Sequence, residues 1–341
     1  MPQNVTIKLP VPSRLNPGLA AARERHLKWM RQQNLVLGPR AARRYLFSAV
    51  ADLAAYSYPD AEGDDLDLAF DTMGWFFLFD DLFDVPERCE AHEAVDVCRQ
   101  LIALVSRPSA RGVDHDAPLV SAFEDIWRRA RAGMSEEWQQ RAAHNWADYL
   151  TGNLTEEIDR RTWVPQDFAT RMRIGHRTLG LIPSLDLAER VGHFEIPQII
   201  WHSSQLESMR RAAVDAVKLI NEVMSLENDD ARGDPNLVHC LMRQRDCSRQ
   251  EAILLAVALV QTAVGQLFEQ ARRIPLFCSR LGLTSTQSEK VQQYANALLT
   301  WIRGSYDWSR SNGRYSPRTA SALSPDLTGE LHPANLTPVS P

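Results

Sequence analysis

The most informative stretch of this 341-residue sequence is LDLAFDTMGWFFLFDDLFD, residues 66–84. Its apolar residues recur at the i, i+3/i+4, i+7 spacing of a helix that buries one face. The run ends in Asp80, Asp81 and Asp84, and helical residues four apart differ by only about 40° in azimuth, so Asp80 and Asp84 share a face. Carboxylates beside aromatic rings are costly unless a cation neutralises them. The stretch therefore predicts a core helix with a cation-binding end; the alternative is a solvated acidic helix end before Pro86.

The same helical period recurs along nearly the whole chain, whereas the alternation typical of strands is nearly absent. Clusters of proline and glycine separate the helical segments. We therefore expect an all-α single domain of about ten or more helices with short connections. An extended arm is expected over 1–15, a helical domain over 16–316, and a flexible tail rich in Pro, Ser and Thr over 317–341. The expected helices cover 20–33, 41–56, 66–83, 92–106, 120–132, 136–151, 168–178, 206–229, 249–273 and 286–312.

Composition argues against several classes of protein. The net charge of −5 lacks the basic excess of a nucleic-acid binder, so no nucleic-acid partner is expected. Five widely spaced cysteines fit neither a disulfide framework nor a zinc ribbon. The N-terminal segment lacks the features of a signal peptide. The most apolar stretch, 252–268, contains two glutamines and indicates a buried core helix rather than a membrane span, so we expect a soluble, cytoplasmic protein.

A second polar pattern lies in NEVMSLENDD, residues 221–230. Asn221, Ser225 and Asp229 are spaced by four, so they line one side of a helix within about 80°. An amide oxygen, a hydroxyl and a carboxylate together make an oxygen cage that suits one divalent cation such as Mg²⁺. Taken alone, this triplet is better interpreted as an ordinary polar stripe. Beside an acidic helix end, it indicates a metal-assisted site.

Together these patterns resemble those of the bacterial class I terpene synthases. The resemblance runs from Trp29 to Tyr315 and is greatest to the group that makes small oxygenated terpenes, the linalool/nerolidol and cineole synthases. It implies a single α-helical bundle around a central active-site cavity. The matching residues are Asp80, Asp81 and Asp84 for the aspartate-rich motif, Asn221, Ser225 and Asp229 for the Asn/Ser/acid motif, and Arg314-Tyr315 for the C-terminal pair.

The resemblance also implies roles for these residues and for three Mg²⁺ ions. Asp80 and Asp84 would bind two of the ions, and the Asn221, Ser225 and Asp229 set would hold the third. When the active site closes, Asp81 would accept a hydrogen bond or form a salt bridge, with Arg314 as the candidate partner. Arg314 and Tyr315 would donate to the substrate diphosphate, as suits a charged, bidentate donor. Ring faces stabilise carbocations, so Phe76, Phe77 and Trp308 are candidate lining residues, although core packing is the commoner role of any single ring.

Two positions depart from the family pattern. The family usually has Glu at the last metal position and a basic residue just before it, where this chain has Asp229 and Asn228. Arg232, one turn away, is the candidate to replace the missing cation. The family also has a diphosphate-sensing Arg upstream of Asn221, and the corresponding position here is Gly175. Of the flanking residues, Arg173 and Arg177, we choose Arg173 as the sensor; a surface salt bridge is its alternative role.

The implied activity is Mg²⁺-dependent ionisation of geranyl or farnesyl diphosphate to an allylic carbocation, ended by proton loss or water capture. The product would be a mono- or sesquiterpene, with an acyclic or monocyclic alcohol expected. We expect a short substrate because Phe76, Phe77 and Phe79 stand directly before the aspartates. The alternatives are a chain-elongating prenyltransferase, which carries two aspartate-rich motifs, and a non-catalytic helical scaffold. The assembly considered, besides a monomer, is a homodimer.

Overall fold

The computed structural model describes residues 5–84, 91–106, 113–162 and 166–315, without the side chains of Leu82, Asp84 and Ala91. All regular elements in these ranges are helices, which confirms the predicted all-α class. The predicted tail, 317–341, lies outside the described residues. The helices are α1 (Leu19–Gln32), α2 (Gly38–Ser48), α3 (Leu53–Ser57), α4 (Gly63–Asp84), α5 (Ala91–Ser106), α6 (Pro118–Arg131), α7 (Glu136–Arg161), α8 (Phe168–Thr178), α9 (Leu181–Val191), α10 (Gln198–Trp201), α11 (Ser204–Arg232), α12 (Leu237–Arg245), α13 (Arg249–Arg280) and α14 (Ser285–Ser311).

The single helix predicted over 41–56 is wrong, because the chain forms α2 and α3 there with a break between them. Ala49 adopts a left-handed backbone conformation, with φ +53°, which interrupts the right-handed helix. The Trp308 indole N–H donates to the Ala49 carbonyl at 2.7 Å. A contact with the far end of the chain therefore accompanies this break.

Two prolines that indicated breaks lie inside helices instead. Pro183 lies in the first turn of α9, where a backbone N–H has no helical partner to lose. Pro275 lies within α13 on an exposed position, where water can bond the carbonyl that the ring frees. Helix α9 was consequently missed, and α13 runs further than expected.

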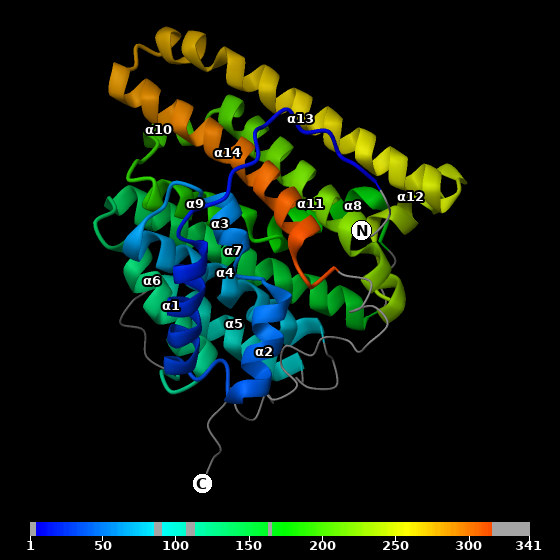
Figure 1. The fold of residues 1–341 in the computed structure, drawn as a ribbon. Coiled ribbons are helices and arrows are strands. Elements are labelled where there is room, and N and C mark those ends of the chain that lie inside the picture. The colour runs from blue at the N-terminus through cyan, green and yellow to red at the C-terminus, as the bar shows by residue number, and fades with distance from the viewer. Residues whose placement is uncertain (1–4, 85–90, 107–112, 163–165, 316–341) are drawn as a thin grey trace.

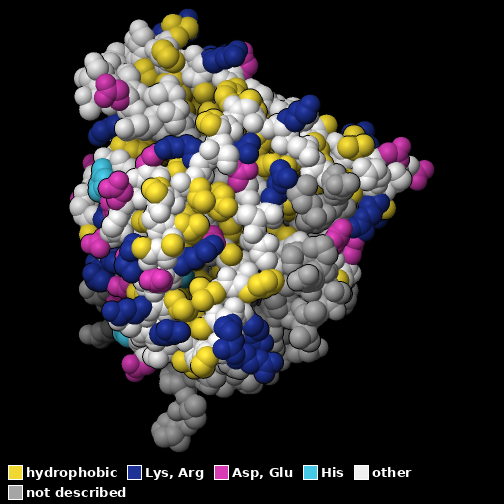
Figure 2. Space-filling model, viewed as in Figure 1, with side chains coloured by type: hydrophobic (Ala, Val, Ile, Leu, Met, Phe, Trp, Pro, Cys, Tyr) yellow, Lys and Arg dark blue, Asp and Glu magenta, His cyan; other side chains and the backbone are white. Residues whose placement is uncertain are grey.

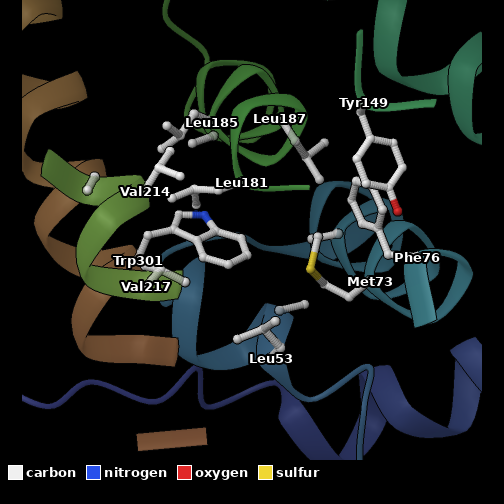
Figure 3. Packing of buried hydrophobic residues seen from close by; sticks show 14 of the residues in the cluster. Leu53, Met73, Phe76, Tyr149, Leu181, Leu185, Leu187, Val214, Val217 and Trp301 are labelled. Carbon is white, nitrogen blue, oxygen red and sulfur yellow. The ribbon is translucent and has the colours of Figure 1, made fainter. Parts of the chain in front are cut away.

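Helix α9 lies at the centre of the fold, since it contacts α4, α6, α7, α11 and α14. Figure 3 shows buried side chains that converge around it from other helices: Met73 and Phe76 of α4, Tyr149 of α7, and Trp301 of α14. In Figure 1, α11, α13 and α14 form one side of the bundle and α1 and α4 to α7 form the other. The apolar interior therefore lies between these two groups.

The N-terminal segment before α1 is extended and packs on the end of the bundle. Ile7 is 2% exposed, and its backbone N–H donates to the Tyr306 hydroxyl at 3.0 Å. The Asn16 side chain donates to the Tyr58 and Ala61 carbonyls at 3.1 and 2.7 Å. The arm thus connects α14, across which it passes in Figure 1, to the loop that precedes α4.

On the face seen in Figure 2, acidic, basic and apolar side chains are interspersed, with one compact basic group over α2. That helix carries Arg40 and Arg43 on its exposed side. Among the described residues, α13 alone is long and apolar enough to cross a membrane. In its most apolar window, 44% of the residues are buried inside the molecule, and a core helix passes the same test.

Candidate active site

The acidic end of α4 is anchored by a buried tyrosine of α7. The Tyr149 hydroxyl donates to Asp80 Oδ1 at 3.0 Å. Burial, together with the neighbouring Asp80, raises the pKa of Tyr149 above its ordinary value, so the phenol stays a donor and fixes that oxygen. Asp81 follows on the same turn, and both aspartates are partly buried. Asp84 ends the helix backbone, but its side chain lies outside the described part of the chain.

The last turns of α11 bring together the second set of predicted residues. Ser225 Oγ donates to Asp229 Oδ2 at 2.6 Å, and Arg232 lies 3.4 Å from Asp229 Oδ1. Arg232 therefore lies beside this carboxylate, and it also pairs with Asp234 at 2.9 Å. Its role as the replacement cation stays a prediction. Burial raises the pKa of Asp229 even though Ser225 and Asn236 bond its charged form.

Asn236 was not singled out from the sequence, yet it also fixes Asp229. Its side-chain amide donates to Asp229 Oδ2 at 2.7 Å and to the Glu222 carbonyl at 2.9 Å. Its oxygen accepts from the Val238 N–H at 2.8 Å and so caps α12. The one available signal was an Asn just before an apolar run, which is typical of a helix start.

The C-terminal segment joins the two helices. Asn221 Nδ2 donates to the Tyr315 hydroxyl at 2.9 Å, and Asn228 Nδ2 donates to the Arg314 carbonyl at 2.7 Å. The Arg314 guanidinium stands 5.0 Å from the centre of the Phe77 ring on α4. Arg314 therefore contacts both helices that carry the predicted metal ligands. Asn228, which departs from the family pattern, holds the backbone of this arginine.

The aromatic candidates divide into two groups. Phe77 lies against Trp308 with a centroid distance of 5.4 Å, and Trp308 lies 5.8 Å from Tyr315, so these rings adjoin the C-terminal pair. Phe76 stacks on Trp146 at 4.9 Å and meets the edge of Tyr149 at 5.1 Å. Phe79 is fully buried and stacks on Trp75, which gives it a core role.

The predicted sensor region is arranged around Gly175 on α8. Arg173 is exposed. Arg177 Nε pairs with Asp148 Oδ1 of α7 at 2.8 Å. Gly175 is buried, and a Cβ placed on it would stand 2.7 Å from the Lys218 side chain of α11. Lys218 could not be found from the sequence, because its contact with Gly175 depends on how α8 packs on α11.

The donor set fits a divalent cation that is completed by a ligand. Asn221, Ser225 and Asp229 offer the hard oxygen donors that Mg²⁺ prefers. Burial raises the pKa of the Asp229 carboxyl group, and a bound cation would stabilise its charged form. No group of three or more His, Cys, Asp or Glu side chains among the described residues could hold a metal ion.

Comparisons with known proteins identify the family. Residues 71–266 match the terpene synthase family 2 profile, described as C-terminal metal binding. The R-linalool synthase of Streptomyces clavuligerus is 42% identical over 334 residues, 98% of each chain. The pentalenene synthase of Streptomyces avermitilis is 37% identical, with 95% of this chain and 96% of that one covered. A crystal structure of the linalool/nerolidol synthase of S. clavuligerus in complex with 2-fluorogeranyl diphosphate matches with a TM-score of 0.81 and 40% identity, covering 90% of this chain and 99% of that one.

The all-helical bundle, together with these matches of sequence and structure, places the chain among the class I terpene synthases. The chain belongs to this class, in terpene synthase family 2. The predicted family, fold class and enzyme class are thereby confirmed. The family description also confirms metal binding at the level of the family.

Proposed function

We propose that this enzyme ionises geranyl or farnesyl diphosphate with the help of Mg²⁺ and releases a small terpene. The observation that carries the proposal is the position of Arg314, whose carbonyl is held by α11 and whose guanidinium lies over a ring of α4. A diphosphate bound between the two helix ends would meet this guanidinium. The names of the relatives support the same substrates, since one binds a geranyl diphosphate analogue and another cyclises (2E,6E)-farnesyl diphosphate.

Asp80 and Asp84 would hold two Mg²⁺ ions, and Asn221, Ser225 and Asp229 would hold a third. When bound, the metal neutralises charge that develops on the leaving diphosphate. Asp81 would pair with Arg314 when the site closes, and Arg232 would supply a further positive charge beside Asp229.

Arg314 and Tyr315 would donate to the diphosphate oxygens during ionisation. Burial raises the pKa of Tyr315 despite the nearby Arg314, so its hydroxyl keeps the proton that it donates. Preformed donors of this kind stabilise developing charge without reorganisation. Arg173 would sense the diphosphate from α8, with Arg177 as the second candidate for that role.

The apolar side chains would protect and stabilise the carbocation. Phe76, Phe77 and Trp308 come from α4 and α14, and each ring face that meets the cation contributes about 0.5–2 kcal/mol when water is excluded. The cation would end by proton loss or by capture of one water. We expect an acyclic or monocyclic alcohol, in keeping with the similarity to the R-linalool synthase. The space beside Gly175 does not supply room for the water, because the Lys218 side chain fills it.

The test is incubation with geranyl, farnesyl or geranylgeranyl diphosphate, each with Mg²⁺, followed by gas chromatography of the extract. The expected result is conversion of the ten- or fifteen-carbon substrate without isopentenyl diphosphate. A strict requirement for isopentenyl diphosphate would instead indicate chain elongation. In isotopically labelled water, the product oxygen should carry the label. Exclusive formation of an unoxygenated polycyclic hydrocarbon would contradict the alcohol, and preference for geranylgeranyl diphosphate would contradict the short substrate.

A further inference from the structure

A buried cation lies on the same face of α11 as the proposed metal ligands. Lys218 precedes Ser225 by two turns, and at 100° per residue it falls within about 20° in azimuth of both Ser225 and Asp229. Its side chain is 12% exposed, and its ammonium group lies 2.6 Å from Glu222 Oε1. The ion pair with Glu222 directs the ammonium group toward the C-terminal end of α11, where the proposed ligands lie.

The stem of Lys218 occupies space that only a glycine leaves open. A Cβ added at Gly175 would lie 2.7 Å from Lys218 Cε, 3.0 Å from Cδ and 3.2 Å from Cγ. The methylene groups therefore lie against the backbone of α8, and the nearest carbon is the one that bears the ammonium group. Any side chain at position 175 would have to displace Lys218, so the two residues form a complementary pair.

The neighbouring residues fix the position of the Lys218 ammonium group, and the group stays positively charged. The other oxygen of Glu222 accepts from the Leu237 N–H at 2.7 Å, so this carboxylate is fixed at the start of α12. Burial alone lowers the pKa of Lys218, but the charges of Glu222 and Glu156 outweigh burial and raise it. Arg171 also faces this group and is itself bonded to the Pro235 carbonyl at 2.9 Å.

We infer that Lys218, on α11, binds the substrate diphosphate. Its positive charge takes the place of the arginine that α8 lacks at position 175. This inference rests on the proposed function. Lysine is a flexible point charge that binds phosphate well, and rotation about its side-chain bonds can turn the ammonium group from Glu222 toward a phosphate oxygen. The competing role is purely structural, in which Lys218 only neutralises the buried Glu222.

Calorimetric titration with inorganic diphosphate and Mg²⁺ separates the two roles. Lys218→Met should weaken diphosphate binding at least tenfold, and Lys218→Arg should retain most of it. Because Lys218→Met leaves Glu222 buried without its partner, the double variant Lys218→Met/Glu222→Gln removes both charges and restores folding. Diphosphate binding should stay weak in this double variant. Wild-type affinity in it would overturn the inference, since only the structural role predicts that outcome.

The matched control is Arg211→Met, because Arg211 forms the same i, i+4 ion pair with Glu207 on the exposed side of α11. It should bind diphosphate like the wild type. If the wild type itself binds no diphosphate with Mg²⁺, both the proposed function and this inference fail. If the wild type and Lys218→Met/Glu222→Gln bind diphosphate equally well, only the inference fails.

Exchange of the two positions gives an independent readout. Gly175→Arg alone should lower the melting temperature, because the new side chain collides with Lys218. In the double variant Gly175→Arg/Lys218→Ala, the space is open and the charge returns from α8. Diphosphate affinity should then recover at least threefold over Lys218→Ala. Unchanged affinity in Lys218→Ala relative to the wild type, or no recovery in the double variant, would contradict a charge shared between these positions.

Discussion

Replacement of Asn236 by Ala tests how the proposed third metal position is built. The substitution removes the amide that donates to Asp229 Oδ2 at 2.7 Å and to the Glu222 carbonyl at 2.9 Å, and it removes the cap on the Val238 N–H. A lost helix cap costs about 1 kcal/mol. A lost hydrogen bond to a buried charged group costs about 1.5–3 kcal/mol. Together these losses should lower the free energy of unfolding by roughly 2.5–4 kcal/mol.

Two measurements follow from this arithmetic. The melting temperature should fall by roughly 4–6 °C, since an unfolding entropy of about 2.1 cal/mol/K per residue makes about 1 kcal/mol correspond to about 1.5 °C in a chain of this length. The Mg²⁺ concentration that gives half-maximal turnover should rise, because Asp229 loses the partner that orients its oxygen. The control is Asn236→Ser, since serine keeps the cap but is too short to reach Asp229. It should be the more stable variant and show the same Mg²⁺ defect; wild-type Mg²⁺ dependence in both variants would refute this role of Asn236.

Substitutions at three further positions give the remaining predictions. Asp80→Ala should lower turnover by several orders of magnitude, measured with saturating Mg²⁺, and more than half the wild-type rate would contradict its assignment as a ligand. Asp229→Glu should keep or improve Mg²⁺ affinity in a titration, whereas Asp229→Ala should raise the requirement strongly; no change in either variant would place the third ion elsewhere. Burial raises the pKa of Glu189 from its ordinary value of 4.5 to about 8, despite the Arg141 charge. Between these pH values the folded state therefore holds a proton that the unfolded chain has lost. The free energy of unfolding should consequently fall as the pH rises from about 4.5 to 8. Glu189→Gln should remove this slope in denaturant unfolding followed across that pH range, and an unchanged slope would show that another group titrates.

The parts of the site that could be predicted from the sequence are those that a single helix determines. Asp80 and Asp84, like Asn221, Ser225 and Asp229, share a face because of residue spacing alone. Tyr149 could not be found in this way, because its bond to Asp80 joins residues 69 positions apart. Asn228 and Lys218 likewise act through packing between helices. The roles of all these residues remain predictions.

The helices of the fold also divide into features that local sequence predicts and features that long-range contacts determine. The period of the apolar residues gave the all-α class and placed α8 at Phe168–Thr178. The break at Ala49 was missed, because the bond from Trp308 that accompanies it spans 259 positions. Helix α9 was missed because Pro183 indicates a break until its place in the first turn is known. Local pattern therefore predicts helices well, and the long-range contacts decide where they end.

The contact between the N-terminal arm and α14 bears on how the protein should be prepared. The Ile7 N–H bonds to Tyr306, two residues before Trp308, and Trp308 packs against Tyr315. A deletion that removes Ile7 therefore removes a bond to the same helix that ends beside the Arg-Tyr pair. Truncation past Ile7 should lower turnover even though no deleted residue belongs to the site. A preparation that keeps Ile7 keeps this bond to α14.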